Sequence, residues 1–306
     1  MRIIDKYKDE NYLFDIDDIV EISIQRIIDA YRMSQNLGLG RLFVTFSGGK
    51  DSVCVYYLCK MASERLGMSS MDELGEYVYN VTTIDPPELV YFIRTFKNVQ
   101  RVRPEKNFFR LIIEIGMPPL RQKRYCCAEL KERGGMGRFC LTGVRWAESI
   151  RRRNSRGSLE VLGKTPKENK ILNADNDDDR RLLEKCVLKR KFICNPIVDW
   201  GDGDVWRFIA KYNLPYCTLY DEGWKRIGCL NCPMASKRER EREMERYPGY
   251  KALYLRTFAR MLEERKKKGK TTNEKWKDAQ AVYDWWIGKK EIQQRIRELE
   301  REIERH

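Results

Sequence analysis

The sequence predicts an α/β fold, an open parallel sheet with a C-terminal helical appendage. Short apolar runs at residues 42–46, 76–85, 138–144 and 192–200 are separated by longer segments, several of which have apolar residues at helical spacing. Strands that alternate with helices are typical of parallel sheets. From residue 237 onward, charged helix-forming residues dominate, which predicts that this last part is helical.

The predicted organisation has three parts: an N-terminal helical lead-in at 1–40, an α/β domain at 41–236 and a basic helical extension at 237–306. The first part contains apolar residues at helical spacing between Asp17 and Gln35, which predicts an amphipathic helix. No apolar run approaches the length of a membrane span, and the first residues lack a secretory apolar region. We therefore expect a cytoplasmic protein.

Cysteine and histidine usage narrows the chemistry. The chain has ten cysteines, which in a cytoplasmic protein are expected to be thiols, so that a cluster of them indicates metal or redox chemistry. The single histidine is His306, the last residue. This placement excludes a Ser-His-Asp triad and a Cys-His pair within the folded body.

The first predicted strand, Leu42 to Phe46, runs into a glycine pair and then into a helix expected from Ser52 to Leu66. Backbone N–H groups converge at such a helix N-terminus and form an anion site, to which Lys50 adds positive charge. Phosphate is the expected anion. The alternative is a glycine-rich turn without a ligand. The predicted loop consists of Ser47, Gly48, Gly49, Lys50, Asp51 and Ser52.

The next two predicted strands also end in polar residues. The strand at 76–85 ends at Asp85, before Pro86 and Pro87 start a helix; Asp85 could contact ribose or a metal ion, or cap that helix. The strand at 138–144 delivers Gly143 and Arg145 to the sheet edge, where a guanidinium suits phosphate or sulfate. Glu148 and Ser149 follow. The strand at 192–200 precedes a helix expected over 205–212.

The positive charge is concentrated in two segments. Residues 117–156 carry 11 Lys/Arg against 3 Asp/Glu, a net +8, and residues 237–306 carry 21 against 14, a net +7. The first segment surrounds the predicted chemistry, where it would attract a polyanion. The second could bind DNA or RNA, although a solvated helix face is the preferred interpretation. Residues 154–190, with their acidic run, are predicted to be a surface excursion without a metal site.

Four cysteines form two close pairs, Cys126-Cys127 and Cys229-x-x-Cys232. Four thiolates can hold zinc or an iron–sulfur cluster. Adjacent cysteines strain the tetrahedron around a single ion but can reach two irons of a cubane, which favours [4Fe-4S]. The remaining alternative is two unrelated groups of buried thiols.

Five motifs together resemble the phosphoadenosine-phosphosulfate (PAPS) reductase-like family of the PP-loop superfamily, over about residues 41–235. They are Ser47–Ser52, Arg124–Lys131, Thr142–Ser149, Asn195–Trp206 and Leu219–Cys232. Cluster-bearing members of this family include adenylylsulfate reductases and, more distantly, the ATP pyrophosphatases of DNA phosphorothioation. The resemblance implies a Rossmann-like, adenine nucleotide alpha-hydrolase-like sheet.

The resemblance also implies roles for individual residues. It implies an adenine nucleotide on Ser47–Ser52, phosphate or sulfate contacts from Arg145, and a [4Fe-4S] cluster on the four paired cysteines. Lys131 matches a basic residue near the cluster of the reductases; a solvent-facing lysine is the alternative. The expected cofactors are thus the cluster, ATP or a sulfonucleotide, and Mg²⁺.

Two departures from the reductase pattern weaken the expectation of reductase activity. No cysteine follows Cys232, so the C-terminal nucleophile of the reductases has no counterpart here. Cys217, Cys186 or Cys194 could substitute, although each is more typical of an inert buried thiol. The reductases' Asp-Thr-Gly after the second strand is replaced by Asp85-Pro86-Pro87.

Three functions follow, in order of preference. The first is a PP-loop ATP pyrophosphatase or adenylyl-transfer enzyme acting in sulfur incorporation into, or modification of, a nucleic acid, with Lys50, Asp51 and Arg145 as catalytic residues. The second is a sulfonucleotide reductase with a relocated nucleophilic cysteine and a thioredoxin-like reductant. The third is a non-catalytic nucleotide- and cluster-bearing subunit of a complex. The sulfur donor is not specified by the sequence.

Overall fold

The computed structural model describes residues 2–7, 16–132, 134–162, 170–172, 191–270 and 275–288. The chain forms two compact units. Unit 1 comprises residues 1–80, 87–102 and 133–227, and unit 2 comprises residues 81–86, 103–132 and 228–306. The predicted three-part division follows the order of the sequence, whereas these units interleave segments from different parts of it.

Unit 1 contains a sheet whose strands lie in the order β3-β2-β1-β4-β7-β5-β6. β1 (Leu42–Thr45) lies between β2 (Gly75–Asn80) and β4 (Phe139–Leu141), and both pairings are parallel. β3 (Val99–Val102) extends the parallel part on one side and β7 (Lys191–Cys194) on the other. The strand order reverses beside β1, and in open α/β sheets ligands bind at such a reversal, beyond the carboxyl ends of the strands.

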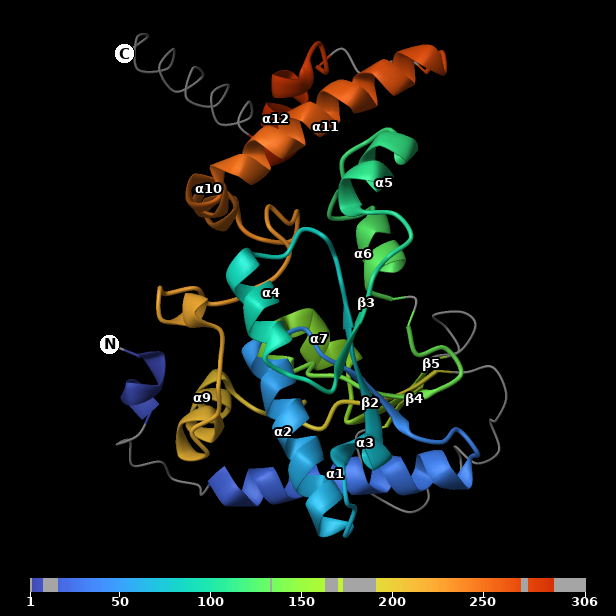
Figure 1. The fold of residues 1–306 in the computed structure, drawn as a ribbon, viewed down its shortest axis with the longest axis vertical. Coiled ribbons are helices and arrows are strands. Elements are labelled where there is room, and N and C mark those ends of the chain that lie inside the picture. Colours follow the sequence, from blue (N-terminus) through green and yellow to red (C-terminus); the bar gives the residue numbers. More distant parts are fainter. Residues whose placement is uncertain are drawn as a thin grey trace. The chain divides into compact units, whose positions relative to one another are not determined.

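Helices of unit 1 cover this sheet (Figure 1). α1 (Ile16–Asn36) packs against β1, β4 and β7, and it also contacts α2 (Lys50–Arg65) and α9 (Asp202–Lys211). α1 buries an apolar stripe that includes Val20, Ile24, Ile27 and Ile28, as the helical spacing predicts. The remaining helical elements are short: η1 (Ile3–Tyr7), α3 (Met71–Leu74), α4 (Pro87–Arg94), η2 (Trp146–Glu148), α7 (Ile150–Ser155) and η4 (Thr218–Tyr220).

The predicted α/β class and the first strand, loop and helix are confirmed, but several boundaries are wrong. The second predicted strand ends at Asn80 rather than at Asp85, because residues 81–86 leave the sheet for unit 2. The strand predicted at 192–200 ends at Cys194, after which the chain turns. β3 was not predicted, because its Gln100-Arg101 centre is polar and exposed on an edge strand.

The prediction of a surface excursion over 154–190 is wrong for its first part. β5 (Leu159–Leu162) pairs antiparallel with β7, and β6 (Lys170–Leu172) pairs antiparallel with β5. These strands are short and lie among charged residues, so the sequence showed no apolar run that would predict them. Glu160 on β5 is buried and accepts hydrogen bonds from Arg156 and from the side-chain amide of Asn195. The acidic run at 175–179 lies outside the described residues.

Unit 2 is helical in the described residues. It contains α5 (Phe108–Ile115), α6 (Tyr125–Leu130), α10 (Lys237–Arg246), α11 (Pro248–Lys267) and α12 (Ala279–Ile287). Its core joins segments far apart in the sequence: Phe108, Leu111 and Ile112 from α5 are buried in one cluster with Tyr254 and Phe258 from α11. The C-terminal helices are thus part of a shared core with residues 103–132.

Among the described residues, none of the helices has the length and apolar character needed to cross a bilayer.

Candidate nucleotide and cysteine sites

The loop after β1 is built by two glycines. Gly48 has φ +72°, a left-handed conformation that glycine adopts without strain, and a Cβ there would lie 2.6 Å from Ile93 Cγ1 and 2.9 Å from Leu89 Cδ1 of α4. Gly49 is the N-cap residue of α2 and supplies no side-chain hydrogen bond to the helix end. The loop therefore presents backbone rather than side chain at the start of a 16-residue helix.

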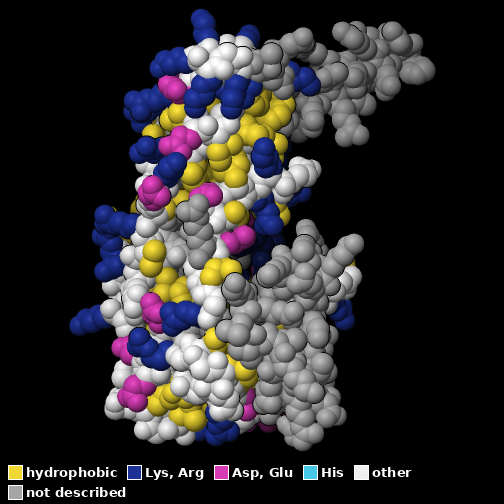
Figure 2. All heavy atoms as spheres, turned by 90° about the vertical axis from the view of Figure 1, so that its right-hand side faces the viewer, with side chains coloured by type: hydrophobic (Ala, Val, Ile, Leu, Met, Phe, Trp, Pro, Cys, Tyr) yellow, Lys and Arg dark blue, Asp and Glu magenta, His cyan; other side chains and the backbone are white. Residues whose placement is uncertain are grey.

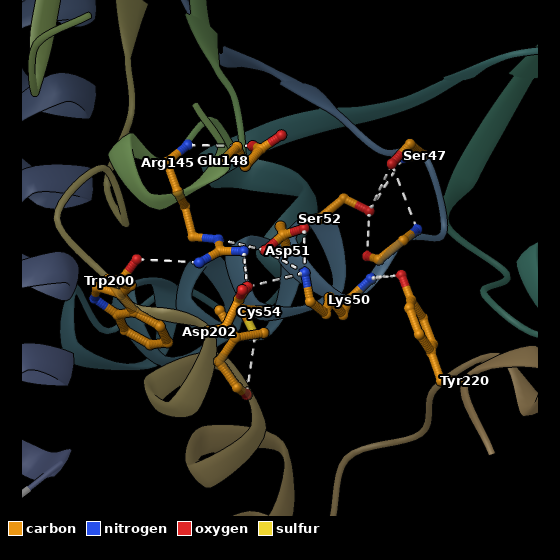
Figure 3. Close-up of polar contacts among 12 residues, drawn as sticks. Ser47, Lys50, Asp51, Ser52, Cys54, Arg145, Glu148, Trp200, Asp202 and Tyr220 are labelled. Atoms are coloured by element: carbon orange, nitrogen blue, oxygen red, sulfur yellow. Dashed lines mark hydrogen bonds and ion pairs between the residues drawn. The ribbon is translucent and has the colours of Figure 1, made fainter. Parts of the chain in front are cut away.

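The first N–H groups of the loop donate to hydroxyl oxygens (Figure 3). Ser47 N donates to Ser52 Oγ at 3.2 Å, Gly49 N to Ser47 Oγ at 3.4 Å, and Lys50 N to Tyr220 Oη at 3.0 Å. These hydroxyls belong to neutral side chains, and a phosphate oxygen is a stronger acceptor at a helix N-terminus. The arrangement can therefore accept an anion by exchanging hydroxyl partners for phosphate oxygens.

Arg145 lies at the centre of the charges behind the loop. It is 1% exposed, and its three nitrogens all donate: Nε to Asp51 Oδ1 at 2.5 Å, Nη1 to the carbonyl oxygen of Trp200 at 3.1 Å, and Nη2 to Asp202 Oδ1 at 2.7 Å. Burial lowers the pKa of Arg145, but the charges of Asp51 and Asp202 outweigh it and leave that pKa raised. Arg145 is thus a charged group in which each nitrogen has an acceptor and which fixes both carboxylates.

Lys50 completes this group of charges. Its side chain is buried, and Nζ lies 3.2 Å from Asp51 Oδ2 and 3.7 Å from Asp202 Oδ1. Although burial opposes ionisation of Asp202, the hydrogen bond from Arg145 and the charge of Lys50 lower its pKa. Two cations therefore face two carboxylates, and the Asp202 side chain is 72% exposed, so that this carboxylate remains accessible to solvent.

The three other residues predicted on this edge lie close to the loop or support it. A Cβ on Gly143 would lie 3.1 to 3.2 Å from backbone atoms of Asp51 and Ser52, so β4 approaches the start of α2 closely only because residue 143 is glycine. Glu148 accepts from Arg145 N and from Arg152. Ser149 caps α7 by accepting from Arg152 N at 3.2 Å.

Arg152 belongs to a basic group that was not predicted as such. Burial lowers the pKa of Arg152, and the charges of Arg226 and Arg156 lower it further, whereas Glu148 and Asp51 oppose this effect. Three arginines therefore lie close enough for their charges to repel, near one of the loop carboxylates. Clustered cations of this kind attract polyanions.

The four paired cysteines all belong to unit 2. Cys126 and Cys127 lie on α6, and Cys229 and Cys232 lie in the turn that precedes α10. A hydrogen bond with Cys127 raises the pKa of Cys126, as do burial and the charges of Cys229 and Cys232; the same hydrogen bond lowers the pKa of Cys127 to about 6. The four thiols therefore interact electrostatically.

Two other predicted residues face these thiols. Lys131 is exposed to solvent, and the charge of Cys229 raises its pKa, which Asp85 raises further. Burial raises the pKa of Cys229 to about 12. Asp85 thus lies in the surroundings of Lys131 and Cys229, inside unit 2. Within the described ranges, no three His, Cys, Asp or Glu side chains are grouped closely enough to hold a metal ion.

The cysteines considered as substitute nucleophiles are buried where they are described. Cys217 is 1% exposed, and burial raises its pKa to about 11. Cys194 is also buried, at the end of β7. Neither thiol is accessible as a nucleophile must be, and the raised pKa of Cys217 also opposes its ionisation. Cys186 lies outside the described residues.

Residues 41–235 match the family described as "Phosphoadenosine phosphosulfate reductase domain". The chain belongs to this family. Among curated relatives, an adenosine 5'-phosphosulfate reductase of Lysinibacillus sphaericus is 24% identical over 190 residues, which are 58% of this chain and 72% of the relative. An uncharacterized protein of Methanocaldococcus jannaschii is 29% identical over 248 residues, 76% of this chain but only 51% of that protein.

Solved structures with a similar chain path include members of two enzyme types. A PAPS reductase from Candida auris in a phosphate complex has a TM-score of 0.43 at 15% identity, covering 73% of this chain and 98% of the other. An FMN adenylyltransferase of Candida glabrata with FMN and an ATP analog has a TM-score of 0.44 at 13% identity, covering 79% of each chain.

The family membership confirms the resemblance, and the family is one of enzymes that act on adenine nucleotides. The structure also places three groups in the loop site that the sequence did not single out: Asp202, Tyr220 and the carbonyl oxygen of Trp200. A signal existed for Asp202, which follows the strand-like run that ends at Trp200 and so belongs to the carboxyl edge of the sheet. Tyr220 lies in the Leu219–Cys232 motif, but nothing in that motif indicated that its hydroxyl accepts from Lys50 N.

Proposed function

We propose that this chain is a PP-loop enzyme that binds ATP on Ser47–Ser52 and cleaves it between the α and β phosphates. The observation that carries the proposal is the start of α2, where N–H groups converge on weakly held hydroxyl partners beside buried Lys50. These N–H groups and Lys50 Nζ would stabilise the charge that develops on the departing pyrophosphate.

Arg145 would act behind the loop. Because three of its five N–H groups already donate to Asp51, Asp202 and Trp200 O, we propose that it orients the two carboxylates and contacts a phosphate oxygen through a remaining N–H group. Carboxylate oxygens and substrate phosphates are the ligands that Mg²⁺ prefers, so Asp51 and Asp202 fit this ion. When bound, Mg²⁺ would offset the charge of the triphosphate.

The cysteine site of unit 2 would hold the [4Fe-4S] cluster. Its donor set consists only of thiols, which suits iron–sulfur chemistry, and two adjacent cysteines suit a cubane better than one ion. Both cysteine pairs belong to unit 2, on α6 and in the turn before α10, which supports this assignment, with Lys131 as the cluster-proximal cation. Bound, the cluster would supply electron transfer or sulfur chemistry.

We further propose a nucleic acid as the acceptor. Exposed cations on and directly after α11 include Arg256, Arg260, Lys266, Lys267 and the C-cap residue Lys268. Figure 2 shows Lys and Arg side chains next to hydrophobic side chains on the face that it presents. Phosphate backbones bind such surfaces through neutralised charges, and the binding weakens with salt. The Arg152, Arg156 and Arg226 group would attract the phosphates of either substrate.

A sulfonucleotide reductase is the second candidate, because several relatives carry the name adenosine 5'-phosphosulfate reductase. The burial of the Cys217 and Cys194 thiols, together with the raised pKa of Cys217, argues against it. In a complex that uses the chain only as a nucleotide- and cluster-bearing subunit, ATP would bind without turnover.

One experiment separates these functions. The protein is purified without oxygen, its iron and sulfide are measured, and it is incubated with ATP, with and without DNA or tRNA, or with a sulfonucleotide. We expect pyrophosphate from ATP, reduced at least about a hundredfold in Lys50→Met and unchanged in Lys60→Met, an exposed lysine on the same helix. Sulfite from the sulfonucleotide without pyrophosphate from ATP would refute the proposal.

Nucleic-acid binding is tested separately by a mobility-shift titration at two salt concentrations. The double variant Arg256→Glu with Arg260→Glu should bind DNA or tRNA more weakly and with a smaller salt dependence. Lys60→Glu, in unit 1, is the control. Equal affinities of the double variant and the control would exclude α11 as the binding surface.

A further inference from the structure

The turn between Cys229 and Cys232 is held from three sides by unit 2. Leu230 N donates to the carbonyl oxygen of Ile84 at 2.9 Å, and Tyr254 Oη donates to the carbonyl oxygen of Leu230 at 2.8 Å. Asn231 is fully buried with φ +59°, a conformation that asparagine tolerates better than most residues. Its N–H donates to the carboxylate of Glu243. The turn is therefore fixed by residues far away in the sequence.

Arg240 on α10 is a buried, charged side chain that contacts the turn between Cys229 and Cys232. Its side chain is 7% exposed; Nε donates to Asn231 Oδ1 at 2.7 Å and Nη1 to the carbonyl oxygen of Trp286 at 3.2 Å. The guanidinium carbon lies 4.3 Å from the centre of the Trp286 ring, a cation–π distance. One end of Arg240 therefore holds the cysteine turn, and the other is anchored on α12.

The third nitrogen of Arg240, Nη2, is buried and has no hydrogen-bond partner in the described residues. A buried N–H without a partner lowers the stability of the fold, most of all in a charged group. Burial lowers the pKa of Arg240, whereas negative charge on Tyr254, Tyr283 or Cys232 would raise it. Through Asn231, the residue that precedes Cys232, Arg240 contacts the turn that carries two of the paired cysteines.

A buried cation with an unused N–H suits a site that carries negative charge. Four thiolates that hold a cluster give such a site, and N–H donors and cations next to cluster sulfurs are known to set the reduction potential. Glu243 does not supply this charge in full, because burial raises its pKa to about 7. The environment of Arg240 therefore fits the group proposed for the cysteines.

We propose that Arg240 is a positioning residue for the cysteine site: it fixes the Cys229–Cys232 turn through Asn231 and places its positive charge and its unpartnered Nη2 beside that turn. This inference rests on the proposed cluster. It assigns a role to α10 and α12, which lie beyond the residues 41–235 that match the family.

Two variants separate the two parts of this role. Arg240→Gln removes the charge, and Arg240→Lys keeps the charge but loses the fork that bridges Asn231 and Trp286. Arg238→Gln, exposed on the same helix, is the control. The readouts are the midpoint potential of the cluster, iron per chain, and amide hydrogen exchange of residues 228–233 in the iron-free protein.

We expect Arg240→Gln to lower the reduced-to-oxidised ratio of the cluster about tenfold at a fixed potential, a shift of about 59 mV for a one-electron couple. Arg240→Lys should retain most of the potential. Both variants should exchange the turn amides at least about tenfold faster than the wild type and the control. If Arg240→Gln does not fold, the amide hydrogen exchange of the turn is measured in Arg240→Lys instead.

An unchanged midpoint potential in Arg240→Gln would overturn the electrostatic part of the proposal, and unchanged exchange in both variants would overturn the positioning part. A wild-type chain that binds no iron would overturn the electrostatic part together with the proposed cluster. The exchange measurement does not depend on iron, so in that case it still decides whether Arg240 holds the turn.

Discussion

Replacing Gly48 by alanine tests the geometry of the loop. Two separate penalties are expected. The left-handed φ of +72° costs a non-glycine residue about 1–2 kcal/mol. The new Cβ would lie 2.6 Å from Ile93 Cγ1 and 2.9 Å from Leu89 Cδ1, and the resulting overpacking adds about 1–3 kcal/mol. The total loss of unfolding free energy should be about 2–5 kcal/mol.

Gly67 provides a matched control at the other end of α2. Its φ is +69°, but a Cβ there would meet no atom within 4 Å. Gly67→Ala therefore has the conformational penalty without the steric one, and the entropy that alanine removes from the unfolded chain is the same for both variants. The two variants should differ by about 1–3 kcal/mol.

Thermal unfolding followed by circular dichroism measures this difference. At about 2–4 °C per kcal/mol for a domain of 150–250 residues, Gly48→Ala should unfold about 2–12 °C below Gly67→Ala. Equal midpoints would show that Ile93 and Leu89 move aside without loss and would refute the steric argument. ATP should stabilise Gly67→Ala as it does the wild type, but stabilise Gly48→Ala less.

Three further predictions concern buried polar groups. Arg145→Met should lower stability in urea by about 2–3 kcal/mol, less than the 3–5 of a fully buried pair, because Asp202 remains exposed to water. Tyr220→Phe leaves Lys50 N without its acceptor, so stability should fall by about 1–3 kcal/mol without ligand and by less with saturating ATP. The wild type should lose up to about 3 kcal/mol of unfolding free energy as the pH rises from about 4.5 to 7, because the pKa of Glu243 is raised. Glu243→Gln should not show this loss.

The sign of the Glu243 prediction follows from its raised pKa. Between pH 4.5 and 7 the folded chain keeps a proton that the unfolded chain releases, so folding weakens as the pH rises and levels off above about 7. A wild type and a Gln variant with parallel pH profiles would contradict this reasoning. For Tyr220→Phe the contrary result is an equal loss with and without ATP, and for Arg145→Met it is unaltered stability.

Local sequence signals were sufficient to predict those parts of the structure that consist of one continuous segment of the chain. The apolar run at Leu42, the glycine pair and the following helical pattern predicted β1, the loop and α2, because strand, turn and helix are consecutive there. The same holds for Gly143, which follows β4. Where the structure depends on distant partners, the sequence was insufficient. Tyr220 reaches Lys50 N from 170 residues away.

The partners of Arg145 show the same limit. The motif predicted a guanidinium at the sheet edge and assigned it to phosphate, but Asp51, Asp202 and Trp200 O occupy its nitrogens in the structure. The spacing of apolar residues in the sequence does not indicate whether a buried arginine has hydrogen-bond acceptors within the protein. The short strands β5 and β6 were missed for a related reason, since pairing with β7 rather than local composition defines them.

The interleaving of unit 2 affects how the chain can be made and cut. Phe108, Leu111 and Ile112 leave the ribosome long before Tyr254 and Phe258, which complete their core. Until the C-terminal helices have been synthesised, the apolar side chains of this part of α5 stay exposed to solvent. Chains in such a state can aggregate or bind chaperones. A gene shortened after residue 236 would leave the same surface permanently bare. The C-terminal helices thus cannot be removed as an independent module without endangering the fold of residues that precede them by more than a hundred positions.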